Sequence, residues 1–291
     1  MIDLLVVGHV VKDVLDDGSY RIGGTAAYAS ALGRALGLRV GVLTVTSRDL
    51  LEHPALASID VRGRVVDEPT RFDNRYQGSA RAQRLLSRAP DIAAADLPAE
   101  WRATKLVLLG PVIGEVDASM ARAFEPNTRV AACLQGWLRQ VDGDGRVSAR
   151  PFQRFDARAL LPSLEAAFLS PEDLQPDERD AAVNAWRALV DPLLYTLAED
   201  GARVLRGSAN SAHVAAFSAN TVDPTGAGDI FAAAYLVARG DGLEVEPAAR
   251  FAACAASFIV EAPALQRVPD RASIARRLRD GERNPSTSAA L

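Results

Sequence analysis

Residues 222–237 read VDPTGAGDIFAAAYLV, a loop of small and acidic residues followed directly by an apolar run. Glycine at positions 226 and 228 permits the backbone angles and close approaches that let successive N–H groups face one anion. The run from Ile230 to Ala238 favours a helix, whose N-terminus adds unsatisfied N–H donors and partial positive charge at the same place. The stretch therefore predicts a loop that leads into a helix and binds an anion such as a phosphate.

Asp229 needs its own explanation, because a carboxylate beside a bound phosphate is electrostatically unfavourable. Held within reach of an acceptor hydroxyl, it can take the proton as that oxygen attacks a phosphoryl group. The structural alternative is that Asp229 only favours the dipole of the first helical turn and that the glycines only form a turn. For an isolated GxG that alternative is the better one, but the string from Asp223 to Asp229 is much more specific.

The string DPTGAGD at 223–229 resembles the C-terminal signature of the ribokinase-like (PfkB) family of carbohydrate kinases. The resemblance extends to VVGHVVKD, IGGTAAYASALGRALG and AACAASFIV, which occur in the order that this family shows. It implies transfer of the γ-phosphoryl of ATP, with Mg²⁺, to a hydroxyl of a small sugar, polyol or nucleoside. By that match Asp229 is the catalytic base, and the backbone of Gly226, Ala227 and Gly228 steadies the transferring phosphoryl.

The same resemblance implies acceptor contacts near the start of the chain. Asp13 and the paired glycines Gly23 and Gly24 occupy the matching positions, although an ordinary solvated loop Asp is the alternative for residue 13. Several sugar kinases of the family carry a Lys and an Asn just after the glycines, whereas this chain has Thr25-Ala26-Ala27-Tyr28. The TRFDNRY and QGWLR segments resemble the inositol-kinase-like branch more than ribokinase itself.

On the donor side, the resemblance implies nucleotide contacts at Thr196, Gly201, Thr225, Gly226 and Gly228. The turn TLAEDG at 196–201 has an alanine, Ala198, where the family's nucleotide-contact turn has its first glycine. The resemblance also allows a monovalent cation such as K⁺ near Asp223.

Residues 170–173, SPED, stand where the family commonly has Asn-x-x-Glu, a motif that helps to organise magnesium. Asp173 is therefore the candidate Mg²⁺ ligand, with one methylene less reach than Glu. The same residues are typical of a helix start, with Ser170 as N-cap, Pro171 at the first helical position and Asp173 completing a capping box. The two interpretations are compatible.

Short apolar runs, such as Ile2–Val7 and Val40–Val45, alternate with helical stretches along the chain. This alternation is typical of α/β proteins with a doubly wound, mostly parallel sheet flanked by helices, and we expect one ribokinase-like domain over residues 1–291. Asp16-Asp17-Gly18 is a turn signal that predicts a small hairpin, and residues 59–76 alternate polar and apolar residues, as half-exposed antiparallel strands do. The resemblance implies that such strands, at about 14–23 and 59–78, form a small discontinuous β lid over the acceptor. Arginines at 81, 84 and 88 have helical spacing, which favours a solvated helix face there.

Composition excludes several other classes of protein. The net charge of −4 gives no electrostatic reason to expect nucleic acid. Two cysteines, Cys133 and Cys254, are too few for a disulfide framework and fit a reducing cytoplasm. The start MIDLLVVGHV indicates a strand and not a signal peptide, and the longest apolar run, 251–260, is too short to span a bilayer. We expect a soluble, cytoplasmic protein without a membrane partner.

Other sequence features bear on two further enzyme classes and one class of non-enzyme. No GxxxxGK[ST] string occurs, which excludes a P-loop enzyme, and no GxGxxG follows the first strand, which disfavours a Rossmann dehydrogenase. The altered 170–173 motif and Ala198 favour a catalytically weakened relative that binds a nucleotide or small ligand as a sensor or regulatory partner. The intact 223–229 string favours the kinase. An exposed lid edge also offers a route to a homodimer.

Overall fold

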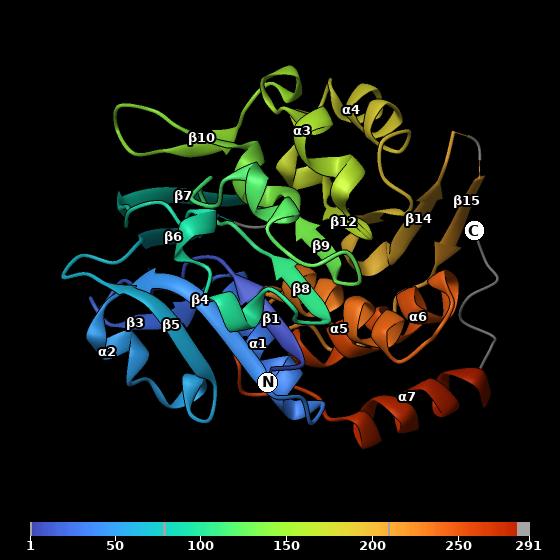
Figure 1. Cartoon of the computed structure of the whole chain (residues 1–291). Coiled ribbons are helices and arrows are strands. Elements are labelled where there is room, and N and C mark those ends of the chain that lie inside the picture. The colour runs from blue at the N-terminus through green and yellow to red at the C-terminus, as the bar shows by residue number, and fades with distance from the viewer. Residues whose placement is uncertain (1, 78–79, 209, 284–291) are drawn as a thin grey trace.

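The computed structural model describes residues 2–77, 80–208 and 210–283, and a large sheet of short apolar strands forms its centre. Within these residues nine strands lie in the order β15-β14-β13-β12-β9-β8-β1-β4-β5 (Figure 1). Neighbours from β13 to β5 run parallel, whereas β14 and β15 add antiparallel strands at one edge. The strands are β1 (Leu4–Val7), β4 (Val40–Thr46), β5 (Asp60–Val65), β8 (Leu106–Leu109), β9 (Arg129–Cys133), β12 (Ala166–Leu169), β13 (Leu193–Thr196), β14 (Ala202–Arg206) and β15 (Asn210–Val214).

Helices cover both faces of this sheet, because successive residues of a buried strand point to opposite sides. In β1, Leu4 and Val6 face one apolar cluster, and Leu5 and Val7 face the other. The first cluster includes side chains of α1 (Thr25–Ala35), α2 (Arg48–Leu51), α5 (Ala227–Gly240), α6 (Val245–Ile259) and α7 (Arg271–Arg283); the second includes those of α3 (Ala157–Leu160) and α4 (Arg179–Trp186) (Figure 1). The predicted mostly parallel sheet flanked by helices is confirmed.

A separate small sheet lies beside the large one and forms the lid, with strand order β3-β2-β6-β7 (Figure 1). Its strands are β2 (Val11–Val14), β3 (Tyr20–Gly23), β6 (Arg71–Gln77) and β7 (Ala80–Ser87). The hairpin predicted around residues 16–18 is present as the antiparallel pair β2 and β3, and β2 also pairs in parallel with β6. A further hairpin, β10 (Arg139–Val141) with β11 (Val147–Ala149), lies against β7, where the Leu85 N–H donates to the Gly145 carbonyl at 2.8 Å.

Two sequence predictions about the lid region are wrong. Residues 60–65 do not join the lid, because β5 pairs in parallel with β4 at the edge of the large sheet. Gly63, with φ of 129°, makes this contact so close that a Cβ there would lie 1.8 Å from the Thr44 carbonyl oxygen. Residues 80–87 form the strand β7 and not a helix face, because β6 supplies an antiparallel partner along their length.

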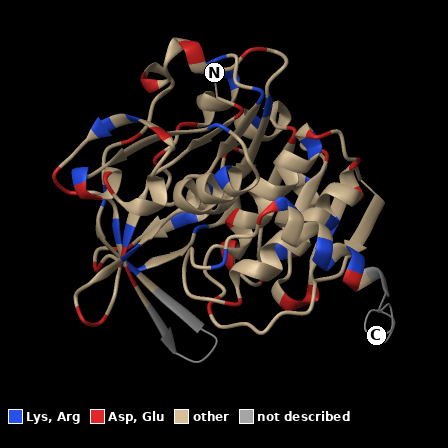
Figure 2. Ribbon diagram, turned by 90° about the horizontal axis from the view of Figure 1, so that it is seen from below, with Lys and Arg blue, Asp and Glu red and all other residues tan. Residues whose placement is uncertain are grey.

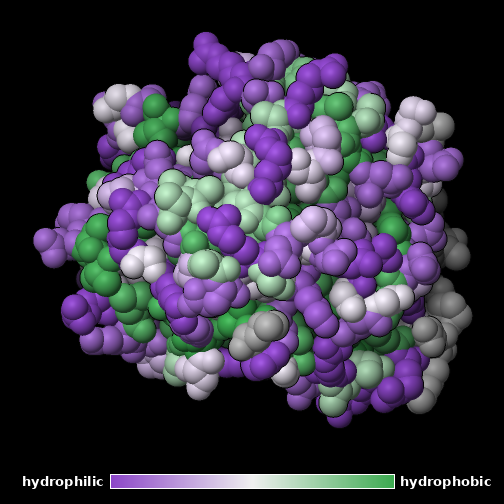
Figure 3. Space-filling model, in the orientation of Figure 1, coloured by the Kyte–Doolittle hydropathy of each residue, from purple (hydrophilic) through white to green (hydrophobic). Residues whose placement is uncertain are grey.

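Charged and apolar side chains are mixed over the surface. In the view of Figure 2, acidic and basic residues are interspersed along the ribbon, in keeping with the small net charge. On the face drawn in Figure 3, hydrophilic residues separate small hydrophobic patches. Among the helices that the structure describes, none combines the length and apolar character needed to cross a membrane.

Candidate active site

The loop before α5 forms a turn that leads directly into a helix, as the sequence predicts. Gly226 adopts the left-handed conformation, with φ of 82°, and caps α5, which begins at Ala227. A Cβ on Gly226 would lie 2.2 Å from the ring of Tyr28, so both the backbone angle and the contact require glycine. At Gly228 a Cβ would meet open space. The N-terminus of α5 is therefore tightly packed on its Tyr28 side and open beside Gly228.

The predicted base, Asp229, lies in the first turn of α5 and is held by a residue from the N-terminal motif. The Thr25 hydroxyl donates to Asp229 Oδ1 at 2.6 Å. This distance is typical of a charge-assisted O–H···O⁻ hydrogen bond, which fixes the orientation of the carboxylate. Thr25 is the first residue of α1, directly after Gly23 and Gly24, so the bond brings the two sequence motifs together.

Asp13 lies in the lid strand β2 and not in a loop, and it belongs to a chain of side-chain hydrogen bonds across the lid. Asn74 of β6 donates through Nδ2 to Asp13 Oδ1 at 2.7 Å, and Gln83 of β7 donates to Asn74 Oδ1 at 2.8 Å. A Cβ on Gly23 would lie 2.3 Å from Asp13 Oδ2, and one on Gly24 would lie 2.5 Å from a backbone oxygen. Gly23 thus gives the Asp13 side chain room to lie against the backbone of β3, and Gly24 allows the close approach to the His9 carbonyl.

Tyr28 lies among carboxylates from both motifs. Burial raises the pKa of the Tyr28 hydroxyl well above its usual range, and the negative charges of Asp13, Asp223 and Asp229 raise it further. These charges act on the hydroxyl because they are close to it. The structure therefore brings the predicted acceptor ligand, Asp13, and the predicted base, Asp229, to one site around the Tyr28 side chain.

Asp223 connects the signature loop to its surroundings. Arg21 of the lid strand β3 lies 3.3 Å from Asp223 Oδ2, which forms an ion pair between the lid and the loop. Asp223 Oδ1 accepts the Thr225 N–H at 3.0 Å, and Oδ2 accepts the Ala264 N–H at 3.4 Å. Thr225, a predicted nucleotide contact, is thus held through its backbone in an ordered turn directly before Gly226.

Asp173 closes the capping box that the sequence predicts at residues 170–173. It ends the short 3₁₀ helix η8 (Pro171–Asp173), and its Oδ2 accepts the Ser170 N–H at 2.7 Å and the Ser170 hydroxyl at 3.1 Å. Burial raises the pKa of Asp173, and the hydrogen bonds from Ser170 oppose this rise. Burial also raises the pKa of the Cys133 thiol, and the negative charges of Asp229 and Asp173 raise this pKa further. Both carboxylates are therefore near Cys133, the last residue of β9.

The oxygens of Ser170 and Asp173 are hard donors of the kind that Mg²⁺ prefers. Because Mg²⁺ usually keeps several waters and binds one or two carboxylates together with substrate phosphates, a single carboxylate at this place fits such an ion. A cluster of three or more His, Cys, Asp or Glu side chains that could hold a metal alone does not occur among the described residues.

Thr196 and Gly201, the other predicted nucleotide contacts, flank a tight turn at the carboxyl end of β13. The Thr196 hydroxyl donates to the Leu169 carbonyl at 3.3 Å. Gly201 has φ of 87°, and a Cβ there would lie 2.1 Å from the Val214 carbonyl oxygen, so this position also requires glycine. Ala198, in place of the family's glycine, adopts φ of 51°. The carboxyl ends of neighbouring parallel strands share one edge of a sheet, which is where ligands of such folds bind.

Sequence reasoning missed the roles of Thr25, Gln83 and Arg21. In the sequence Thr25 stands out only as a departure from the residues that sugar kinases carry there, because its partner Asp229 lies 204 residues further along the chain. Gln83 lies in a segment whose arginine spacing favoured a helix, which hid its place on a lid strand. The position of Thr25 directly after the paired glycines is a weak indication that it belongs to the site, and it does not indicate that Asp229 is its partner.

Similarity to known proteins covers most of the chain. Residues 162–271 match a family model described as pfkB family carbohydrate kinase. Over 273 residues the chain is 29% identical to an inositol 3-kinase of Zea mays, and this match covers 84% of the chain and 68% of the relative.

Solved structures with the same fold include two with bound ligands. One is a pyrophosphate-dependent kinase in the ribokinase family, complexed with a pyrophosphate analog and myo-inositol; its TM-score is 0.76 at 23% identity, with 94% of this chain and 99% of that chain covered. Another is the ribokinase of Arabidopsis thaliana complexed with ribose and ATP, with a TM-score of 0.73 at 21% identity and coverage of 95% and 98%. Identities of this size show a shared fold.

Proposed function

This chain has a PfkB-family carbohydrate kinase domain and is therefore a phosphotransferase with a hydroxyl acceptor, and we propose that it transfers the γ-phosphoryl of ATP to a polyol or sugar. The acceptor class that we favour is a cyclic polyol of the inositol type. The match to an inositol 3-kinase along most of the chain supports this choice. The residues after the paired glycines, Thr25-Ala26-Ala27-Tyr28, lack the Lys and Asn that several sugar kinases of the family carry there, which disfavours sugar recognition of that type.

One observation carries the proposal: the Thr25 hydroxyl lies 2.6 Å from the Asp229 carboxylate. A general base must be a fixed acceptor within hydrogen-bond reach of the proton that it removes. The bond to Oδ1 holds the carboxylate at the start of α5, beside the loop that would bind the phosphoryl group. The second oxygen, Oδ2, is then oriented by the same contact.

In the proposed reaction Asp229 accepts the proton of the acceptor hydroxyl as that oxygen attacks the γ-phosphorus. The bond between the γ-phosphorus and the bridging oxygen breaks, and ADP leaves with the bond's electron pair. N–H groups at the Gly226–Gly228 turn face the negative charge that spreads over the transferring phosphoryl. Asp13 and Asn74 would hold the acceptor hydroxyls, and the lid would keep competing water out.

Mg²⁺ bound to the donor phosphates would neutralise part of their charge, and Asp173 with Ser170 are the residues that we propose to hold it through waters. Thr196, Gly201 and Thr225 are the proposed nucleotide contacts. The K⁺ ion that the resemblance allows near Asp223 is not supported by the comparisons with relatives, and we leave it out of the proposed reaction.

The experiment that tests the proposal is phosphoryl transfer to a panel of inositols, pentoses, hexoses and nucleosides, with ATP and Mg²⁺ as donor. A parallel series uses pyrophosphate in place of ATP, because one of the kinases with the same fold is pyrophosphate-dependent. Asp229→Asn serves as the matched blank, since its amide oxygen still accepts from Thr25. We expect turnover with ATP on one acceptor, and a loss of about 10²-fold or more in the variant.

The other outcomes separate the alternatives. Full turnover by Asp229→Asn overturns the assignment of the base, and turnover with pyrophosphate alone overturns the choice of donor. Retained ATP binding without turnover on any acceptor favours the alternative, a catalytically weakened relative that acts as a sensor or regulatory partner. Two departures from the family pattern motivate this alternative: Asp173, which is buried and closes a capping box, and Ala198.

We also propose that the chain forms a homodimer through the lid. The β10–β11 hairpin covers part of the lid edge at β7, so β3 is the edge that we propose for such an interface. Sedimentation velocity of the wild-type chain over a range of concentrations tests this. A monomer at all concentrations contradicts it.

A further inference from the structure

His9 and Glu115 lie where the chain passes between the large sheet and the lid. Within the described residues the chain crosses this boundary in the segments 8–10, 24, 66–70 and 88–92. His9 and Glu115 are both fully buried, at 0% exposure, although Glu115 carries a charge when ionised. Burial of such groups is costly unless hydrogen bonds compensate for the lost water. Their contacts therefore require a specific explanation.

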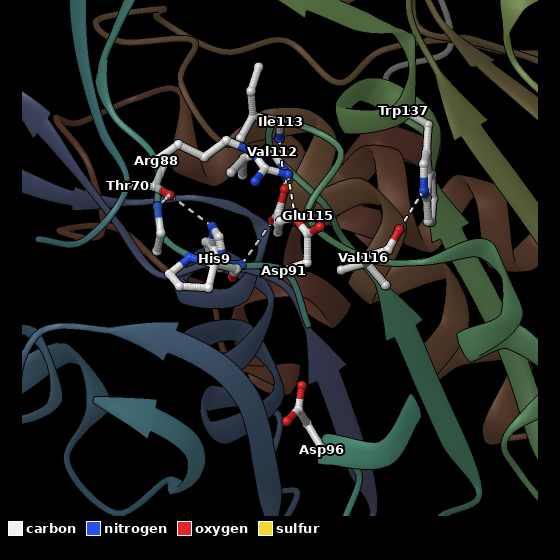
Figure 4. A network of polar contacts seen from close by, with 12 residues as sticks. His9, Thr70, Arg88, Asp91, Asp96, Val112, Ile113, Glu115, Val116 and Trp137 are labelled. Carbon is white, nitrogen blue, oxygen red and sulfur yellow. Dashed lines mark hydrogen bonds and ion pairs between the residues drawn. The ribbon is translucent and has the colours of Figure 1, made fainter. Parts of the chain in front are cut away.

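Glu115 gathers backbone groups from two sides of the boundary (Figure 4). Its Oε1 accepts the His9 N–H at 3.0 Å and the Val112 N–H at 2.9 Å, and its Oε2 accepts the Ile113 N–H at 2.8 Å. The carbonyl of Glu115 accepts the Ile92 N–H at 2.7 Å. One buried residue thus fixes the segment that enters the lid at 8–10, the segment that leaves it at 88–92 and the loop after β8.

The side chain of His9 forms hydrogen bonds with two other segments that cross the boundary, 66–70 and 88–92. Its Nε2 lies 2.9 Å from the Pro90 carbonyl, which can only accept, so this nitrogen carries the proton. The other nitrogen, Nδ1, lies 2.8 Å from the Thr70 hydroxyl and accepts from it, and the Thr70 oxygen in turn accepts the Ala89 N–H at 3.0 Å. A Cβ on Gly24 would lie 2.5 Å from the His9 carbonyl oxygen. Burial lowers the pKa of His9, in keeping with a neutral ring.

The loop after β8, which Glu115 holds, also provides an apolar surface against which the lid strands pack. Val112 and Ile113 pack with Val11 of β2 and Phe72 of β6 in a small cluster that is separate from the two main clusters. Because the Glu115 carboxylate fixes the backbone of Val112 and Ile113, it also fixes the surface on which the lid strands rest.

The hydrogen-bonded group of His9, Thr70 and Glu115, here called the joint, is close in sequence to the proposed acceptor ligands. Asp13 lies on β2, shortly after His9 in the sequence, and Asn74 lies on β6, shortly after Thr70. The two strands pair in parallel, with Asp13 opposite Phe72, and the Asn74 amide reaches Asp13 at 2.7 Å. A change at His9 or Thr70 would therefore be carried along both strands to the same hydrogen bond.

We propose that Glu115 and His9 are positioning residues that hold β2 and β6 in the arrangement in which Asp13 and Asn74 bind the acceptor, an inference that rests on the proposed kinase function. Loss of the joint lowers the fraction of molecules with a competent lid. The apparent affinity for the acceptor falls by that fraction, whereas the transfer step at Asp229 is left intact once the acceptor is bound.

The test compares three variants in steady-state kinetics. Thr70→Val removes the donor to His9 with little change in volume, and Glu115→Gln replaces one accepting oxygen by an amide that cannot accept the backbone N–H groups. We expect KM for the acceptor to rise on the order of tenfold in both, with kcat within about twofold of wild type. The matched control is Thr104→Val, since the Thr104 hydroxyl is buried and has no partner among the described residues; its KM stays unchanged.

Backbone amide hydrogen exchange gives a readout that does not depend on activity. In Thr70→Val and Glu115→Gln we expect faster exchange in β2, β6 and residues 112–113, with α5 and α6 unchanged. Uniformly faster exchange, or a fall in kcat with an unchanged KM, overturns the positioning role. If the wild-type chain turns over no acceptor with either donor, the proposed function fails, and unaltered exchange of the lid strands in both variants then overturns the joint as well.

Discussion

Gly226 and Tyr28 are in such close contact that a Cβ on Gly226 would lie 2.2 Å from Cδ1 of the tyrosine ring. Tyr28 belongs to α1, Gly226 precedes α5, and these two helices pack against each other on one face of the sheet. The Tyr28 ring therefore packs directly against the turn that we propose to bind the phosphoryl group. The N-terminal glycine motif and the C-terminal signature, which are far apart in the sequence, build one surface.

The two glycines of this turn are expected to respond differently to the same substitution. Gly226→Ala combines a left-handed backbone, which costs an L-residue about 1–2 kcal/mol, with a clash against a buried ring, so the free energy of unfolding should fall by at least about 2 kcal/mol. Gly228→Ala places its methyl in open space inside the helix, where alanine is favoured by about 0.5–1 kcal/mol. Urea denaturation measures both changes.

The same pair separates folding from catalysis. The methyl of Gly228→Ala would point into the space beside the proposed phosphoryl site, so turnover should fall in a variant that is at least as stable as wild type. Wild-type kcat in Gly228→Ala would contradict the placing of the phosphoryl group at this turn.

Removal of the Thr25 hydroxyl is expected to slow the transfer step. Thr25→Val leaves Asp229 without the donor at 2.6 Å, and hydrogen bonds to charged groups contribute about 1.5–3 kcal/mol, so kcat should fall by about tenfold or more. Thr25→Ser keeps the hydroxyl and is the matched control, expected within about threefold of wild type. Initial rates at saturating donor and acceptor measure this. A wild-type kcat in Thr25→Val, or a loss confined to Thr25→Ser, which lacks the methyl group near Gly110, would contradict a role for the hydrogen bond.

Much of the fold could be predicted from local sequence, because a strand buried on both faces leaves a continuous apolar run. The expected strands at Ile2–Val7 and Val40–Val45 correspond to β1 and β4 within two residues at each end. Strand β5 lacks such an apolar run, because it lies at the edge of the large sheet and most of its side chains are exposed. Its polar pattern resembles that of a lid strand, so the sequence predicts the wrong sheet for it.

The site could be predicted only where its residues lie in one motif. Residues 223–229 carry the turn, the helix start and the proposed base together. The partners of these groups, Thr25 for Asp229 and Arg21 for Asp223, come from the first tenth of the chain. Such pairs depend on how α1 and the lid pack against α5, and a single sequence holds no record of that packing.

Both cysteines are expected to resist thiol reagents in the folded protein. Burial raises the pKa of Cys254 to about 12 and also raises that of Cys133, so neither forms the reactive thiolate at pH 8. Reaction with 5,5′-dithiobis(2-nitrobenzoate) at pH 8 should be slow in buffer and rapid in denaturing guanidinium. The variant Cys254→Ser shows which thiol accounts for any residual reaction. Rapid labelling of the native chain would contradict the burial of these side chains.

Ala198 is expected to be a position at which glycine stabilises the protein. Its φ of 51° lies in the left-handed region, which costs an L-residue about 1–2 kcal/mol, whereas glycine adopts it freely and loses part of that gain through its greater freedom in the unfolded chain. We expect Ala198→Gly to raise the free energy of unfolding by about 0.5–1 kcal/mol in urea denaturation. Ala202→Gly is the matched control: Ala202 lies in β14 and is fully buried, so glycine there should destabilise. A loss of stability in Ala198→Gly would mean that the methyl group makes contacts worth more than the backbone strain.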